Sequence, residues 1–182
     1  KMIHSYFDYP PMIEAFAARG NQYEMESYDH VLFSYHGVPV RHITKGDDFN
    51  HCKLGECCNS ITATNQHCYR ANCFATTRAI AAKLEIPKVN YSVVFQSRLG
   101  RDPWLEPYTS DVIEELAKEG KKRVLVFCPA FVADCLETTI EIGEEYQEEF
   151  EEFGGEKLQL VEGLNSHPKW IEAVKELVLE YA

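Results

Sequence analysis

The stretch Val31-Leu32-Phe33-Ser34-Tyr35-His36-Gly37-Val38-Pro39 decides which fold this sequence predicts. It begins as a short apolar run and is closed by a glycine and a proline, which is typical of a buried parallel strand that runs into a turn. His36 lies where the strand passes into the turn. Ligands of open α/β sheets bind at this edge, so the histidine stands where chemistry is expected.

Similar apolar runs recur along the chain and alternate with helical patterns. Strands are predicted at residues 31–35, 91–95, 123–128 and 158–161. Helices are predicted at residues 10–20, 73–86, 110–118 and 168–181, and from about residue 134 to beyond residue 146. This order, with the β-α unit repeated about four times and joined by short links, predicts an α/β fold whose open parallel sheet is flanked by helices on both faces.

Length and composition narrow the classes of protein. With 182 residues, of which 45% are hydrophobic, the chain fits a single globular domain. The net charge of −11 argues against nucleic acid as a partner and favours cations. No apolar stretch approaches the roughly 20 residues of a membrane span, and no signal peptide is recognised, so a soluble, cytoplasmic protein is expected. Because the sequence starts with Lys1 rather than methionine, we expect it to be a portion of a longer chain.

A row of carboxylates follows the third predicted strand. Glu137, Glu141 and Glu145 recur every four residues, along one face of the predicted helix. Like charges at this spacing destabilise an isolated helix, and divalent cations, which favour oxygen ligands, would compensate for the repulsion. His36 can ligate a metal or accept a proton, and a nearby carboxylate can share proton transfers with it. The pattern predicts a metal-handling site; the alternative is a structural histidine and a solvated acidic helix face.

Five of the seven cysteines crowd into residues 50–73. In an intracellular protein such crowding is typical of metal or cluster binding rather than of disulfides. The spacing matches neither zinc pairs nor iron–sulfur signatures cleanly, and leaves a [2Fe–2S] cluster, a zinc ion and free thiols open. The candidate ligands are Cys52, Cys57, Cys58, Cys68 and Cys73. His51 and His67 lie in the same segment and could replace a thiolate.

These motifs resemble the ferrochelatase family, whose members insert ferrous iron into a porphyrin in haem synthesis. The matching segments occur in family order and span nearly the whole chain. They are Phe33-Ser34-Tyr35-His36-Gly37-Val38-Pro39, Gly46-Asp47-Asp48, Phe95-Gln96-Ser97-Arg98-Leu99-Gly100, Trp104-Leu105-Glu106-Pro107, Phe131-Val132-Ala133-Asp134-Cys135-Leu136-Glu137-Thr138 and Leu164-Asn165-Ser166-His167-Pro168.

The resemblance implies a chelatase-like, Rossmann-like half: residues 1–182 would be the C-terminal domain of a two-domain enzyme, with residues 50–73 as a cysteine-rich insertion. It implies that His36 and Glu137 are the catalytic pair and contact the metal. Glu141 and Glu145 would continue as an acidic, metal-guiding track on a helix that the family widens locally to a π form. The residues expected to line the porphyrin cleft are Tyr35, Ser97 and Trp104.

The resemblance also implies the reactants and partners. These are Fe²⁺, a porphyrin (protoporphyrin or coproporphyrin) and the N-terminal half of the same protein, while peripheral contact with a membrane stays open. Some members carry a [2Fe–2S] cluster in an internal cysteine segment, which favours a cluster over zinc here without choosing the four ligands. The alternatives are a related cobalt chelatase, a non-catalytic iron–sulfur or metal-sensing module, and a tetrapyrrole carrier.

Overall fold

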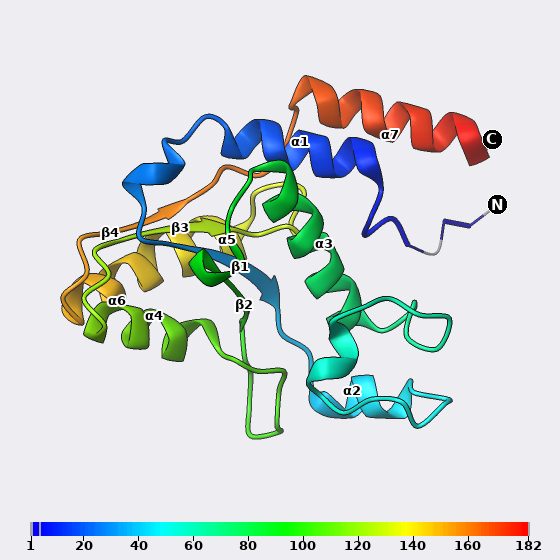
Figure 1. The fold of residues 1–182 in the computed structure, drawn as a ribbon, viewed down its shortest axis with the longest axis horizontal. Coiled ribbons are helices and arrows are strands. Elements are labelled where there is room, and N and C mark those ends of the chain that lie inside the picture. The colour runs from blue at the N-terminus through cyan, green and yellow to red at the C-terminus, as the bar shows by residue number, and fades with distance from the viewer. Residues whose placement is uncertain (1, 4, 182) are drawn as a thin grey trace.

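A computed structural model describes residues 2–3 and 5–181 of the chain (Figure 1). Within this part, all the strands are parallel and form a four-stranded sheet in the order β2-β1-β3-β4. The strands are β1 (His30–His36), β2 (Tyr91–Gln96), β3 (Arg123–Phe127) and β4 (Lys157–Leu160). The predicted open parallel sheet is confirmed, and each predicted strand overlaps one of these.

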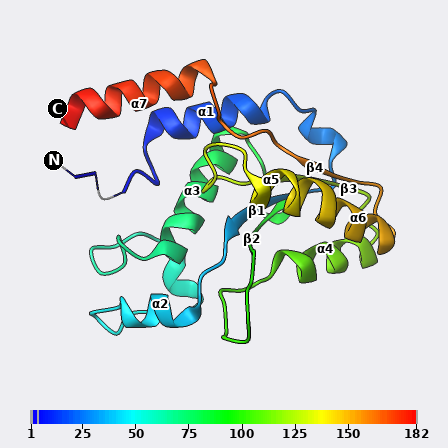
Figure 2. The same cartoon turned by 180° about the vertical axis from the view of Figure 1, so that it is seen from behind.

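Helices cover both faces of the sheet (Figures 1 and 2). Side chains alternate along a strand, so β1 sends Phe33 into a core with α1 and α3 and sends Leu32 into a second core with α4 and α6. The helices are α1 (Pro10–Gly20), α2 (Val40–Lys45), α3 (Tyr69–Lys83), α4 (Thr109–Lys118), α5 (Leu136–Thr139), α6 (Tyr146–Glu152) and α7 (Pro168–Tyr181). Short 3₁₀ turns lie at Met25–Ser27, Glu56–Cys58 and Lys88–Asn90.

The helix predicted at residues 134–146 is not one continuous α-helix. It is divided into α5, a π-helical turn (Glu141–Glu145) and α6, and the turn is marked by the amide of Glu145, which donates to the carbonyl of Ile140 across 2.9 Å. Ile142 within the turn is fully buried. The π widening that the resemblance implies is therefore present, whereas the continuous helix was wrong.

Two further features differ from the sequence-based prediction: the start of one helix and the presence of another. Helix α3 begins at Tyr69, four residues before the predicted start, and Cys68 is its N-cap residue. Helix α2 was not predicted, because its β-branched residues are weak helix formers; burial of Ile43 anchors it. None of the helices in the described part of the chain combines the length and the apolarity needed to cross a membrane.

Candidate active site and cysteine cavity

The carboxyl ends of β1, β2 and β3 lie at one edge of the sheet, and the candidate active site is there. In the pairing of β1 with β2, His36 lies level with Gln96. The loop at residues 128–135 follows β3 at this edge and leads into α5, whose first turn carries Glu137. Because parallel strands end at the same edge, residues far apart in the sequence become neighbours here.

His36 is half-buried and packs near two aromatic rings. The ring centroids of Trp104 and Phe131 each lie 6.3 Å from that of His36. The Nδ1 atom of His36 lies 2.6 Å from the carbonyl oxygen of Gly37. Since a carbonyl only accepts hydrogen bonds, this contact assigns the proton to Nδ1 and leaves Nε2 as the nitrogen that can accept a proton or bind a metal.

Glu137 lies close enough to His36 to respond to its charge. The pKa of Glu137 is lowered, first by the hydrogen bond from its own backbone amide and next by the thiol of Cys135; burial opposes this, and the charge that His36 carries when it is protonated lowers the pKa further. A carboxylate that stays ionised beside an imidazole can attract a cation and stabilise an imidazolium. The structure thus places the Glu137 carboxylate within range of the charge of His36, with no direct hydrogen bond between the two side chains among the described residues.

Glu141 differs from Glu137 because both of its carboxylate oxygens already accept hydrogen bonds. The backbone amide of Ser97 donates to Oε1 across 2.7 Å, and the hydroxyl of Tyr146 donates to the same oxygen across 3.3 Å. The hydroxyl of Ser97 and the Nε2 amide of Gln96 donate to Oε2. Four donors fill the hydrogen-bonding positions of a carboxylate, so Glu141 must give up hydrogen bonds before it can bind a cation.

Gln96 is a fully buried side chain that sequence reasoning did not single out by itself. Its Oε1 accepts from the Ser34 hydroxyl across 2.8 Å, and its Nε2 donates to the backbone carbonyl of Glu137 across 2.6 Å as well as to Glu141. Gln96 therefore ties β1 and β2 to the start of α5 and to the π turn. A polar residue inside an apolar strand was the signal that could have found it.

Glu145 is exposed and lies on a shallow hollow of about 450 Å³. The hollow is lined by Leu136, Glu137, Ile140, Glu141, Glu145, Tyr146 and Glu149. The three glutamates of the sequence pattern therefore share one surface. In the part of the chain that the structure describes, no three His, Cys, Asp or Glu side chains are arranged to hold a metal ion.

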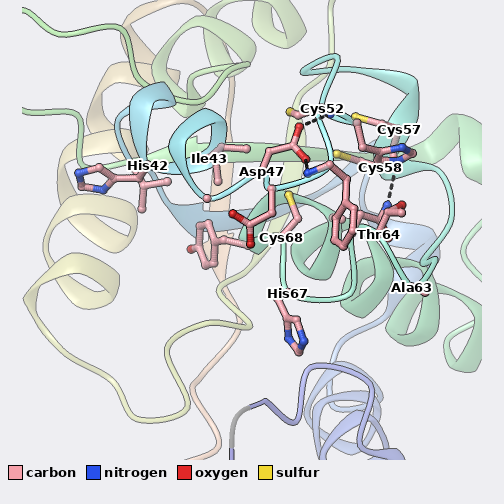
Figure 3. A pocket seen from close by; sticks show the side chains of 18 residues that line it. His42, Ile43, Asp47, Cys52, Cys57, Cys58, Ala63, Thr64, His67 and Cys68 are labelled. Carbon is pink, nitrogen blue, oxygen red and sulfur yellow. Dashed lines mark hydrogen bonds between the residues drawn. The ribbon is translucent and has the colours of Figure 1, made fainter.

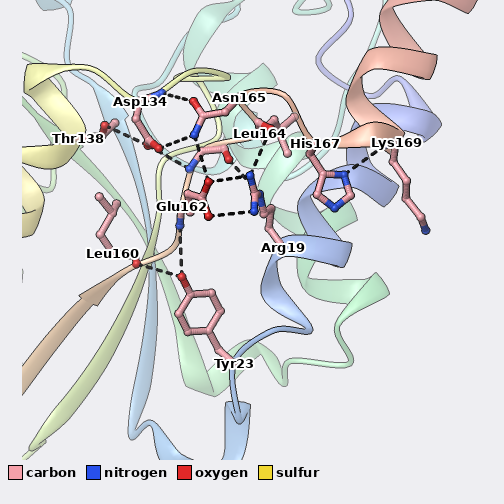
Figure 4. A network of polar contacts seen from close by, with 11 residues as sticks. Arg19, Tyr23, Asp134, Thr138, Leu160, Glu162, Leu164, Asn165, His167 and Lys169 are labelled. Atoms are coloured by element: carbon pink, nitrogen blue, oxygen red, sulfur yellow. Dashed lines mark hydrogen bonds and ion pairs between the residues drawn. The ribbon is translucent and has the colours of Figure 1, made fainter.

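A polar network fixes the loop that precedes Glu137 (Figure 4). The Asn165 amide donates to Asp134 Oδ2 across 2.7 Å and accepts from the Asp134 backbone amide across 2.9 Å. The amide of Gly163 donates to Asp134 Oδ1 across 3.0 Å. Buried Arg19 in turn forms a bidentate pair with Glu162. The segment after β4 thereby holds the loop that places Glu137.

The residues expected to line the porphyrin cleft are placed differently from one another. Ser97 and Trp104 lie beside the His36 edge: Ser97 contacts Glu141, and the Trp104 ring packs against Gly37. Tyr35 instead lies in the core facing α3, where its hydroxyl is 2.8 Å from that of Thr77. Because neighbours in a strand point to opposite faces, the structure does not bring Tyr35 together with the His36 ring.

Four of the five clustered cysteines line one cavity of about 260 Å³ between α2 and α3 (Figure 3). They are Cys52, Cys57, Cys58 and Cys68. Cys73 is buried in the core within α3, where burial raises the pKa of its thiol well above the ordinary value, and it does not line this cavity. Cys73 therefore lies outside the cavity that the other four cysteines line, a distinction that their spacing in the sequence does not reveal.

The cavity offers hydrogen-bond donors to its sulfur atoms. The backbone amides of Leu54 and Lys53 donate to the Sγ atoms of Cys52 and Cys57 across 3.4 Å and 3.3 Å. Burial would raise the pKa of Cys57, but the amides of Lys53 and Gly55 and its neighbouring thiols outweigh burial and lower it. Amide hydrogen bonds to sulfur are one of the ways in which proteins tune iron–sulfur sites.

Arg70 is a buried cation beside this cavity. One of its nitrogens donates to the Sγ of Cys58 across 3.1 Å, and the guanidinium stacks over the ring of Phe74 at 4.6 Å. Burial raises the pKa of Cys58 to about 11 even though Arg70 opposes this. Among the described residues no carboxylate lies within ion-pair distance of Arg70, in contrast to Arg19. His51 also lines the cavity, and its buried Nε2 has no hydrogen-bond partner there.

Comparison with known proteins gives a consistent picture. The family model described as Ferrochelatase matches residues 1–182. Ferrochelatase of Pseudomonas putida strain KT2440 is 45% identical over 181 residues, which cover 97% of this chain and 54% of that protein. Ferrochelatase of Pseudomonas entomophila strain L48 is 46% identical over 96% of this chain and 52% of that protein. The chain thus spans about half the length of the curated relatives it matches.

Proposed function

Because this chain belongs to the ferrochelatase family, we propose that it supplies the catalytic pair of an enzyme that inserts Fe²⁺ into a porphyrin for haem synthesis. One observation carries the proposal: at one sheet edge, Nδ1 of His36 is committed to the Gly37 carbonyl, which leaves Nε2 available, and the Glu137 carboxylate lies within range of the charge of His36. The rest of the polypeptide, the proposed N-terminal half, would complete the cleft. That part is supported by the fraction of each relative that the chain covers.

In the proposed mechanism His36 is the proton acceptor. The two pyrrole N–H protons would leave one after the other through Nε2, because Nδ1 already donates to Gly37; Nε2 would release the first proton to solvent before it accepts the second. The electron pairs left on the two pyrrole nitrogens would bind the incoming Fe²⁺. Glu137 would attract the cation and stabilise the imidazolium that forms. General-base catalysis of this kind contributes roughly 10²- to 10⁴-fold in rate.

The acidic row would guide Fe²⁺ towards Glu137. Exposed Glu145 is well suited to a first contact with a hydrated cation, because oxygen ligands match Fe²⁺ and no described donor occupies its carboxylate. Glu141 would have to exchange its hydrogen bonds with Ser97 and Gln96 for the metal. In this proposal Glu141 binds the cation only in passing.

Anaerobic metallation tests the proposal in the full-length polypeptide, with porphyrin absorbance as the readout and Zn²⁺ as an air-stable second metal. His36→Ala and Glu137→Gln should lower turnover by about 100-fold or more while porphyrin still binds. Glu148→Gln, an exposed change on α6, is the charge-matched control and should keep turnover. Full turnover in both site variants would overturn the proposal, and porphyrin binding without turnover in the parent would indicate a carrier.

We further propose that Cys52, Cys57, Cys58 and Cys68 hold a [2Fe–2S] cluster, with zinc as the alternative. The proposal is supported by the chemistry of the donors, because these four thiols line one cavity and a thiolate site would supply the anion that buried Arg70 lacks. Among the described residues the sulfur atoms are not already grouped around a single metal position, so binding would draw them together. The unpartnered Nε2 of His51 adds a further donor at the same cavity. A bound cluster would supply a one-electron redox centre, and either group would tie the segment between α2 and α3 to the fold.

A cytoplasmic location and peripheral contact with a membrane remain part of the proposal. Neither requires a membrane-spanning helix, and the described residues contain none.

A further inference from the structure

Three consecutive residues at the start of α3 join the cysteine cavity to the active-site edge. Cys68 lines the cavity and is the N-cap residue of α3. The next residue, Tyr69, donates its hydroxyl to the backbone carbonyl of His36 across 2.8 Å. Arg70 follows and donates to the Sγ of Cys58 and, across 3.5 Å, to the carbonyl of Glu106. One helical turn therefore contacts both sites.

The contact with Glu106 reaches the loop that carries Trp104. Backbone hydrogen bonds anchor one side of this loop, from Leu105 to Val38 across 3.0 Å and from Val40 to Pro103 across 2.9 Å. Arg70 contacts the same loop at Glu106, two residues after Trp104. The loop thus depends on a side chain that also contacts the cysteine cavity.

The start of α3 is built in a way that makes it sensitive to what Cys68 binds. Its N-terminus has no side-chain cap, although a capping hydrogen bond typically contributes about 1 kcal/mol. The first turn of a helix frays when tertiary contacts do not hold it. Fraying of this turn would release the Tyr69 contact with His36 and the Arg70 contact with Glu106 at the same time.

We propose that Tyr69 and Arg70 are positioning residues that couple occupancy of the cysteine cavity to the placement of His36 and the Trp104 loop. A group held jointly by Cys58 and Cys68 fixes the backbone that enters α3 and gives the Arg70 guanidinium its counter-charge. With the cavity empty, the first turn of α3 opens more often, and His36 and the Trp104 loop are held less firmly. The inference rests on the proposed porphyrin and cluster sites and assigns the cysteine segment a role that needs no electron transfer.

The test is a linkage measurement on the full-length polypeptide without substrate metal. Porphyrin affinity is measured from the Soret absorbance for protein purified anaerobically with its cluster, as judged by visible absorbance and circular dichroism, and again after chelator has removed it. Loss of the cluster should weaken porphyrin binding by about 5-fold or more in the parent, which is the lower range of typical allosteric couplings. Amide exchange at residues 69–72 should speed up in parallel.

Variants separate coupling from a merely structural effect. The affinity ratio is the porphyrin affinity of the cluster-loaded protein divided by that of the cluster-free protein. In Arg70→Gln and Tyr69→Phe this ratio should fall towards 1, while the visible spectrum of the loaded protein is retained. Arg70→Lys, which keeps the charge beside Cys58 without the forked donor, should recover part of the ratio. Arg78→Gln is the matched control, because Arg78 lies on the same helix and donates to the Cys58 carbonyl across 3.0 Å; its ratio should equal that of the parent.

The outcomes distinguish this inference from the proposed function. A parent that binds no porphyrin overturns the chelatase proposal itself. A parent that binds porphyrin but holds no cluster overturns the cluster proposal and the coupling with it. The coupling alone is overturned if the porphyrin affinity of the parent is the same with and without the cluster. It is also overturned if Arg70→Gln and Tyr69→Phe both keep the affinity ratio of the parent.

Discussion

The backbone amide of Ser97 donates to the Glu141 carboxylate across 2.7 Å, which joins the end of β2 to the π-helical turn. Ser97 has a left-handed backbone conformation, with φ of 63°, and its hydroxyl donates to the same carboxylate as its amide. Such a conformation is uncommon for a residue with a side chain. The two hydrogen bonds from Ser97 to Glu141 offset the cost of this left-handed conformation. They also fix the position of the π-helical turn relative to the end of β2.

Glu141→Gln should destabilise the fold more than Glu145→Gln. A glutamine amide presents N–H donors to some of the four groups that now donate to the carboxylate, at a cost of about 1–3 kcal/mol. Glu145 is exposed, so its variant makes the same charge change without this loss. Urea unfolding followed by circular dichroism measures both, and equal free energies of unfolding would contradict the anchoring role of Glu141.

Two substitutions at Asn165 should separate hydrogen bonding from backbone strain. Asn165 has φ of 45° and makes two hydrogen bonds with Asp134. Asn165→Gly keeps the left-handed backbone accessible and should cost about 1–2 kcal/mol for the lost hydrogen bonds. Asn165→Ala should cost roughly 1 kcal/mol more. Thermal unfolding reports the stabilities, and metallation kcat should fall in both because the loop bearing Glu137 loosens; an unchanged kcat would show that the network is not needed for turnover.

Stability should fall with acidification through His30. Burial and then the charge of Lys121 lower the pKa of His30, whose ring is 2.9 Å from the Ser92 hydroxyl. The folded protein therefore favours the neutral ring, so the contribution is fully present above the unfolded pKa of about 6.5 and is lost as the pH falls below it. His30→Gln should flatten the dependence of unfolding free energy on pH between about 7.5 and 5. Exposed His42→Gln should retain the parent slope; equal slopes in all three proteins would refute the assignment.

Cysteine substitutions should divide the five thiols as the cavity does. Cys68→Ala should abolish the visible absorbance of the anaerobically purified protein, because it removes one of the four thiols that line the cavity. Cys73→Ala should keep that absorbance, since Cys73 lies in the core within α3, although it should lower stability by creating a small void. If Cys73→Ala lost the absorbance and Cys68→Ala kept it, Cys73 rather than Cys68 would be a ligand and the proposed set would be wrong.

Several parts of the fold could be read from the sequence because their causes are local. The four strands are short apolar runs closed by turn residues or by polar segments, and the structure has each of them. The helix that begins at Pro10 also follows from its own pattern, since proline is well suited to the first helical turn. The continuous helix at residues 134–146 failed because a π turn depends on how Ile142 packs against the sheet and not on the spacing of the glutamates.

By itself the sequence determined the alternation of strands and helices, the sheet edge at which His36 lies, and the family to which the chain belongs. Periodicity, turn residues and motif order carry that information within short segments. Only the tertiary structure decided that Glu141 is held by Ser97 and Gln96, that Tyr35 faces α3, and that Cys73 stands apart from the other clustered thiols. These facts depend on contacts between segments distant in the chain, and the identity of one residue does not reveal which distant partner satisfies its hydrogen bonds or its charge.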